Sequence, residues 1–209
     1  MTASNTTAFR NFSLAASGAV LAASAWAAGA APEGLMLDAR LWREEIVAAN
    51  EEGIEEGWYE IAVTADAVRV RAVAKPRANE PVRQDAMFLH RPGAALVEGV
   101  RINHGFPTEE FRPVVGHRYQ RTLGRTEYSF KVWSNAVGTA YVISYDGSDH
   151  EYLLGLPAAA TKVLAVADLD GDRKPDFVVD VGGEIFLLLS SDAKAGLNLP
   201  SAQLWAAAE

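Results

Sequence analysis

The chain has 209 residues, of which 49% are hydrophobic and 22% are charged, and its formal net charge is −8. This balance is typical of a folded chain of one domain, or at most two small ones, and excludes general disorder. The negative charge argues against nucleic acid as a partner, because phosphate binding requires a basic face. No cysteine occurs, which excludes disulfides, thiolate zinc sites and cysteine nucleophiles.

Residues 1–31 have the pattern of a secretory signal peptide. A polar start containing Arg10 precedes the alanine-rich run F-S-L-A-A-S-G-A-V-L-A-A-S-A-W-A-A-G-A-A-P, and small residues suit cleavage between Ala25 and Ala31. A membrane anchor is the alternative, but Ser and Gly interrupt the run and make it a poor bilayer span. We therefore expect an N-terminal signal helix, export to the periplasm or the cell exterior, and no stable membrane insertion after signal removal.

Residues 32–209 are expected to form a single β-rich domain, and its first half contains several short alternating segments. The acidic stretch from Arg43 to Glu56 is broken by glycine and predicts an exposed loop or a short helix. Residues 75–85 predict a polar loop, and residues 103–115, with one glycine and two prolines, predict irregular structure. The strands expected in this half are 35–41, 58–63, 67–73, 87–90 and 95–102, the second and third forming a hairpin.

The second half has stronger strand patterns. Asp146-Gly147 lies between two aromatic and β-branched runs and predicts a tight hairpin turn, because glycine readily adopts positive φ. The strands expected here are 126–133, 140–145, 150–154, 162–167, 177–181 and 184–190. The predicted fold class is therefore mainly β, with antiparallel sheets arranged as a sandwich or a meander.

Four aspartates lie within nine residues of the segment V-A-D-L-D-G-D-R-K-P-D-F-V-V, residues 166–179. They are Asp168, Asp170, Asp172 and Asp176, at positions 1, 3, 5 and 9 of a loop counted from Asp168. Alternate side chains of a curled loop can converge on one point, and the backbone carbonyl of Lys174, at position 7, can join them. Without a cation, carboxylates this close raise each other's pKa.

The ligand set favours calcium over other metals. Ca²⁺ takes about six to eight oxygen ligands at about 2.4 Å from flexible groups, whereas Mg²⁺ tolerates crowded protein cages poorly. Zinc is disfavoured because no histidine or cysteine is nearby. The loop is not an EF-hand, since that motif requires glycine at position 6 and glutamate at position 12, where this chain has Arg173 and Val179.

The segment instead resembles the FG-GAP or VCBS-type repeat of integrin α-chain propellers and many secreted bacterial proteins. That family has an apolar strand, then D-x-(D/N)-G-D-G-x-x-D, then another apolar strand. The residues that match are Asp168, Asp170, Gly171, Asp172 and Asp176. The resemblance implies a Ca²⁺ ion held between two antiparallel strands by the four aspartate side chains and the Lys174 carbonyl.

This resemblance covers only part of the chain. Arg173 replaces the usual glycine at position 6, which predicts strain in the turn or weaker affinity. One copy is present, over about residues 162–190, whereas a propeller needs several blades. The resemblance therefore carries the calcium-loop hairpin, residues 168–176 with their flanking strands, and not the whole fold.

Two functional hypotheses remain open. One is a non-catalytic binding or envelope-associated module, with a protein or glycan ligand that the sequence does not identify. The alternative is a secreted hydrolase whose site is built from distant residues, which predicts a deep pocket holding a carboxylate pair or two or more of the histidines. No histidine pair has metal-site spacing and no G-x-S-x-G occurs. The four histidines are His90, His104, His117 and His150.

Overall fold

The computed structural model describes residues 34–48, 56–73, 83, 85–91, 96–105 and 111–206. The predicted signal peptide, residues 1–31, lies outside them. The described residues form a mainly β structure with predominantly antiparallel sheets, so the predicted fold class is confirmed. No helix within these ranges has the length and apolar character needed to cross a membrane.

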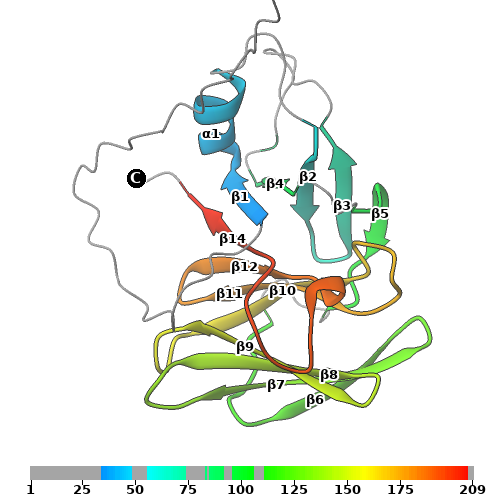
Figure 1. The fold of residues 1–209 in the computed structure, drawn as a ribbon, viewed down its shortest axis with the longest axis vertical. Helices are drawn as coiled ribbons and strands as arrows, with labels where there is room; N and C mark the ends of the chain where they lie inside the picture. Colours follow the sequence, from blue (N-terminus) through cyan, green and yellow to red (C-terminus); the bar gives the residue numbers. More distant parts are fainter. Residues whose placement is uncertain are drawn as a thin grey trace, which may run out of the picture.

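The strands belong to two sheets (Figure 1). The larger has the order β10-β11-β12-β14-β1-β4-β2-β3-β5 and the smaller β13-β9-β8-β7-β6. The strands of the larger sheet are β1 (Gly34–Asp38), β2 (Trp58–Val63), β3 (Ala67–Ala72), β4 (Met87–His90), β5 (Gly99–Ile102), β10 (Thr161–Ala167), β11 (Asp176–Val181), β12 (Glu184–Leu188) and β14 (Ala202–Trp205). Those of the smaller sheet are β6 (Arg118–Leu123), β7 (Thr126–Ser134), β8 (Thr139–Tyr145), β9 (Ser148–Gly155) and β13 (Gly196–Asn198).

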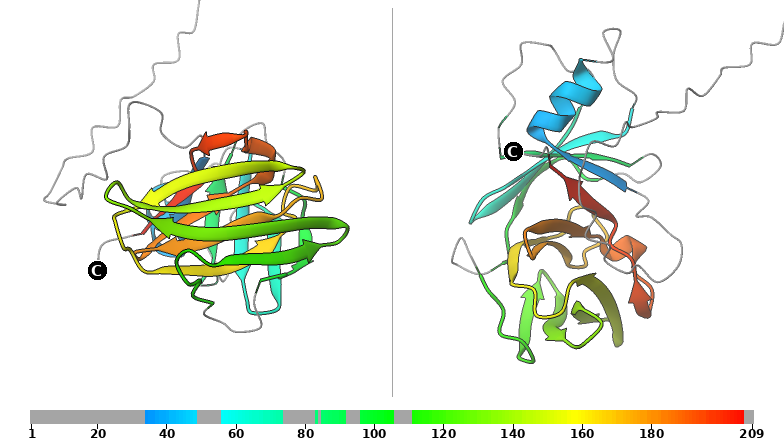
Figure 2. Two further views of the ribbon diagram at one scale, coloured as in Figure 1. Left: turned by 90° about the horizontal axis from the view of Figure 1, so that it is seen from below. Right: turned by 90° about the vertical axis from the view of Figure 1, so that its left-hand side faces the viewer.

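Strands β10, β11 and β12 are buried on both faces. In β11, Phe177 and Val179 pack against the smaller sheet, whereas Val178 points into a second core formed with β1–β4. The smaller sheet and β10–β12 lie as two layers at one end of the molecule, with α1 at the other end (Figure 2, right). Double burial explains why these strands read as continuous apolar runs rather than as alternating patterns.

The larger sheet is nearly closed, because the chain leaving β5 returns to β10. The His104 amide donates to the Val166 carbonyl at 2.7 Å. The Asn103 side chain donates to the carbonyls of Thr64 (3.0 Å) and Leu164 (3.2 Å), and its oxygen accepts from the Val166 amide (3.1 Å). The pairing of β10 with β11 shifts register at this point, between Val163 and Ala165. Asn103 therefore supplies hydrogen bonds where the sheet has no continuous ladder.

The predicted first strand, 35–41, ends earlier than expected. The Asp38 carboxylate accepts from the Leu41 amide at 2.7 Å and caps a helix made of α1 (Ala39–Leu41) and the π-helical turn η1 (Trp42–Val47). Trp42 stacks on Phe88 with ring centroids 4.0 Å apart, so the helix covers the outer face of β4. The short helix expected in 43–56 is thus present at its start, and residues 49–55 lie outside the described ranges.

Several boundaries and three strands differ from the sequence expectations. The strand expected over 95–102 begins only at Gly99, and the one expected over 184–190 ends at Leu188, before the 3-10 turn η2 (Ser190–Asp192). Strands β6, β13 and β14 were not expected. Most of β6 is exposed and polar, so it has no apolar alternation to reveal it.

The predicted hairpin turn at Asp146-Gly147 is confirmed. Both residues have positive φ, 51° and 74°, and they join β8 to β9 with Tyr145 paired to Ser148. Positive φ at both central residues is the geometry that matches the twist of the flanking strands.

Candidate functional site

The aspartate loop joins β10 to β11 at the closed end of their hairpin. Ala167 pairs with Asp176 in the last step of the ladder, and the loop spans the residues between them. On the other side of β11, Phe177 pairs with Leu188 of β12, which brings the following turn η2 beside Asp176. Asp176 is therefore fixed by a strand, whereas the other three aspartates lie on the loop itself.

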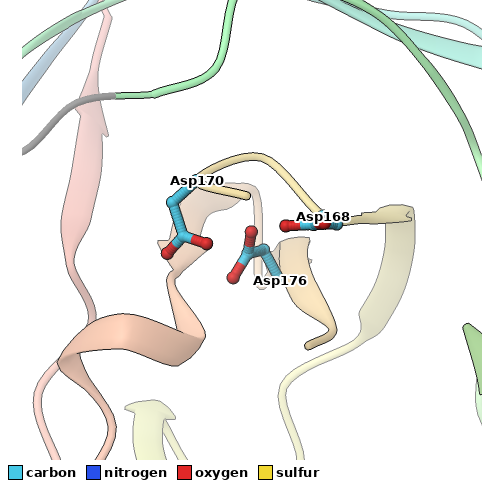
Figure 3. A group of neighbouring side chains, drawn as sticks. All are labelled: Asp168, Asp170 and Asp176. Carbon is cyan, nitrogen blue, oxygen red and sulfur yellow. The ribbon is translucent and has the colours of Figure 1, made fainter. Parts of the chain in front are cut away.

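Three of the four aspartates converge. Carboxylate oxygens of Asp168, Asp170 and Asp176 all lie within 4.8 Å of one another, and the three groups point toward a common space (Figure 3). Asp170 Oδ2 is buried and has no hydrogen-bond partner. A buried carboxylate oxygen without a partner is costly, so this oxygen favours a hydrogen-bond donor or a cation beside it.

Asp176 is the buried centre of the loop, with 1% of its surface exposed. Its Oδ2 accepts from the Leu169 amide at 2.6 Å, and its Oδ1 accepts from both the amide and the hydroxyl of Ser190 at 2.7 Å each. Burial raises the pKa of Asp176 well above its ordinary value, and the charge of Asp170 raises it further. Asp176 thus ties the start of the loop to η2.

Asp172 lies outside the group of three converging carboxylates. Its Oδ1 accepts from the Lys174 amide (2.8 Å) and from the Ser190 hydroxyl (3.0 Å). Partial burial raises the pKa of Asp172, while the hydrogen bond from the Lys174 amide lowers it. Ser190 has a single hydroxyl hydrogen, yet oxygens of both Asp172 and Asp176 lie within hydrogen-bonding distance of it. This serine links the fourth aspartate to the buried one.

Sequence reasoning missed Ser190 because it lies beyond β12 and outside the loop motif, so no local signal marks it.

The side chain of Lys174 contacts the β8–β9 turn. The Lys174 ammonium pairs with Asp146 Oδ2 at 3.1 Å and lies 5.5 Å from the centroid of the Tyr145 ring. The roles of the four aspartates and of the Lys174 carbonyl as metal ligands stay predictions.

Two other segments form hydrogen bonds with the loop. Before β5, the Val97 amide donates to the Leu169 carbonyl (2.8 Å), and within β5 the Arg101 Nε donates to the Asp168 carbonyl (3.2 Å). At the start of β7, the Thr126 hydroxyl donates to the Arg173 carbonyl (2.9 Å). The loop is therefore a junction between the nearly closed sheet and the smaller sheet.

The loop adopts left-handed backbone conformation at two positions. Gly171 has φ 85°, and Arg173, which stands where the family pattern has glycine, has φ 68°. A side chain with a Cβ is strained in this region, by about 1 kcal/mol. The strain that the sequence predicted at Arg173 is consistent with this geometry.

We expect Arg173→Gly to raise the free energy of unfolding by about 0.5–1 kcal/mol, because it removes left-handed strain at a small entropic cost. Urea denaturation of the chelator-treated protein measures the change. Arg125→Gly is the matched control, since Arg125 is an exposed arginine outside the positive-φ set and should gain no stability. A loss of stability in Arg173→Gly would contradict the strain.

The histidines are not gathered into a site. His90 stacks on Trp58 and His150 on Tyr145, while His104 follows β5 and His117 precedes β6. Within the described ranges, the aspartate group is the only set of three histidine or carboxylate ligands close enough to hold a metal.

Comparison with known proteins assigns this chain to no family. No protein-family model, curated protein or solved structure matches this chain. Interpretation of the aspartate loop therefore rests on its own geometry: Asp168, Asp170 and Asp176 are brought together, and Asp172 is connected to them through Ser190.

Proposed function

We propose that this chain is an exported, non-catalytic binding or envelope-associated module whose aspartate loop binds one structural calcium ion. The observation that carries the calcium site is the convergence of Asp168, Asp170 and Asp176, with a buried and unpaired oxygen on Asp170. An all-oxygen set on a curled loop suits Ca²⁺, which accepts irregular geometry and high coordination. Export rests on the pattern of residues 1–31.

A cation at this position would stabilise the junction between the two sheets. The same loop contacts η2 through Asp176, the segment before β5 through Leu169, and the start of β7 through Arg173. Neutralising the converging carboxylates removes the repulsion that opposes this packing. The ion therefore has a structural role, and the proposal assigns it no part in chemistry.

The calcium site is tested by thermal denaturation in excess calcium and in excess chelator. An ion that binds only the native state adds about 2.7 kcal/mol at a concentration one hundred times its dissociation constant, so the melting temperature should rise by several degrees. Magnesium should produce a smaller shift.

Asp170→Ala should abolish the calcium-dependent shift, because it removes the carboxylate with the unpaired oxygen. The control is Asp66→Ala, which removes an exposed aspartate from the β2–β3 turn and should leave the shift intact. An absent shift in the wild-type protein, or an equal shift in Asp170→Ala, would refute the site.

The hydrolase hypothesis gains no specific support from the described residues. The histidines lie apart, and none lines the shallow cavity on the outer face of the smaller sheet. Glu127, Asp146 and Asp149 do line it, but the cavity is open rather than deep. A binding module is therefore the function that the described residues support better.

A further inference from the structure

Strand β6 is the terminal strand of the smaller sheet. It pairs with β7, and no other described strand pairs with it. Leu123 and Thr126 flank the two-residue turn of this hairpin, and such a flanking pair is hydrogen-bonded. By alternation, the backbone groups of Arg118, Gln120 and Thr122 point away from β7. These three residues are also exposed, so a row of backbone donors and acceptors lies at the surface. The Gln120 carbonyl accepts a hydrogen bond from the Arg121 guanidinium at 2.8 Å, which an added strand would have to displace.

The segment that contains β6 is basic in an otherwise acidic chain. Residues 111–131 contain five basic residues and a single acidic one, Glu127, although the net charge of the chain is −8. The basic residues are Arg112, Arg118, Arg121, Arg125 and Lys131. Arg173 of the aspartate loop is also exposed, and its backbone lies beside the β6–β7 turn through the Thr126 hydrogen bond. This local charge favours a negatively charged partner.

A shallow polar cavity of about 580 Å³ lies on the outer face of the same sheet. Its lining contains Glu127, Asp146 and Asp149 but only one basic residue, Arg121, so it suits a neutral polar side chain and not an acidic one. It follows the row of paired residues Gln120, Ser129, Ser144 and Asp149, which crosses four strands from the free edge. The two central residues are serines, and their small side chains form the bottom of the cavity. Arg118 donates to the hydroxyls of Ser129 (3.0 Å) and Ser144 (3.5 Å). The row begins at β6, so a strand added there would place one side chain at its open end.

We propose that β6 is a docking edge for an extended acidic segment of a partner protein, which joins the smaller sheet as an additional strand. Its backbone pairs with the outward groups of Arg118, Gln120 and Thr122, its acidic side chains meet the arginines, and one polar side chain enters the serine-lined row. A second copy of this chain is a poor occupant, because pairing β6 with itself brings arginines of like charge together. The proposal is independent of calcium binding.

Arginines on an edge strand also have a purely protective role, since charge discourages edge-to-edge aggregation. The two roles differ in one measurable respect. A docking edge binds its ligand through backbone hydrogen bonds, so it loses the ligand when an outward N–H is removed. A protective edge forms no such bonds, so removing an outward N–H has no effect on the binding of an acidic or a basic strand.

The test is fluorescence anisotropy with a labelled peptide of alternating glutamate and threonine, and with a lysine–threonine peptide of the same length as the control. The wild-type protein should bind the acidic peptide, more weakly as salt is raised, and not the basic one. Gln120→Pro should weaken this binding about tenfold or more, because proline removes an outward donor and obstructs pairing. Gln120→Ala is the matched variant that keeps the donor and should retain binding.

A charge-reversed variant, Arg121→Glu with Arg125→Glu, keeps the proposal testable if Gln120→Pro fails to fold, which circular dichroism would reveal. This double variant should lose the acidic peptide and gain affinity for the basic one. Three results would overturn the proposal: no binding of the acidic peptide, equal binding of both peptides, or unchanged binding in a folded Gln120→Pro protein or in the double variant.

Discussion

Replacing Asp176 by alanine is expected to lower the free energy of unfolding of the calcium-free protein by about 2–3 kcal/mol, because the lost hydrogen bonds outweigh the relief from a buried carboxylate whose pKa is raised. The carboxylate accepts hydrogen bonds from the amides of Leu169 and Ser190 and from the Ser190 hydroxyl. Alanine leaves two backbone donors without an acceptor at a buried site, and each such loss costs about 1–3 kcal/mol. Urea denaturation in chelator measures the effect, and the same experiment in calcium should show no added stabilisation.

Asp180→Ala provides the matched control on the same strand. The Asp180 carboxylate is less buried and accepts one exposed amide hydrogen bond, from Gly183 at 2.8 Å. Its replacement should cost about 1 kcal/mol or less. An equally small loss in Asp176→Ala would show that Asp176 does not tie the loop to η2.

Asn103→Ala should lower the free energy of unfolding by about 2–4 kcal/mol, through opening of the seam between β5 and β10. The side chain donates to the Thr64 and Leu164 carbonyls and accepts from the amides of Val166 and Gly105. Alanine removes all four bonds, at about 0.5–1.5 kcal/mol for each that water does not replace. Urea denaturation gives the loss, and hydrogen exchange should show reduced protection of the Val166 amide.

Two variants separate this seam from ordinary turn effects. Asn103→Asp keeps the accepting oxygen but loses both donated bonds. Its free energy of unfolding should lie between those of Asn103→Ala and the wild type, or below that of Asn103→Ala where the carboxylate repels the two carbonyls. Asn135→Ala removes an asparagine that accepts only from its own turn, at Val137 and Gly138, and should leave Val166 protected. Full protection of Val166 in Asn103→Ala would contradict the role of Asn103 in closing the sheet.

Strands and turns that can be recognised from their own local sequence were predicted well. The alternation in β7, the aromatic and β-branched run of β8, the apolar runs of β10 and β11 and the Asp-Gly turn all appear at or within a residue or two of the expected positions. These patterns report whether a side chain is buried, or whether the backbone needs positive φ, and both are local properties. Strand β6 was missed because its stability comes from pairing with β7 rather than from burial of its own side chains.

The candidate site shows the same division. The spacing of Asp168, Asp170 and Asp176 along one short loop was enough to predict that they converge, because a few loop residues connect them. Asp172 is not part of the converging group, and its Oδ1 accepts a hydrogen bond from the Ser190 hydroxyl. Nothing in the loop sequence predicts this contact with Ser190.

The sequence by itself therefore determined the class of fold, the positions of most strands and the acidic loop with its clustered carboxylates. Only the tertiary structure decided that β10–β12 are shared by two cores, that Asn103 closes the larger sheet and that Asp176 is joined to η2. The physical reason is that periodicity records the burial of one strand at a time. Which strands meet, and which distant side chain satisfies a buried polar group, depends on contacts between segments far apart along the chain.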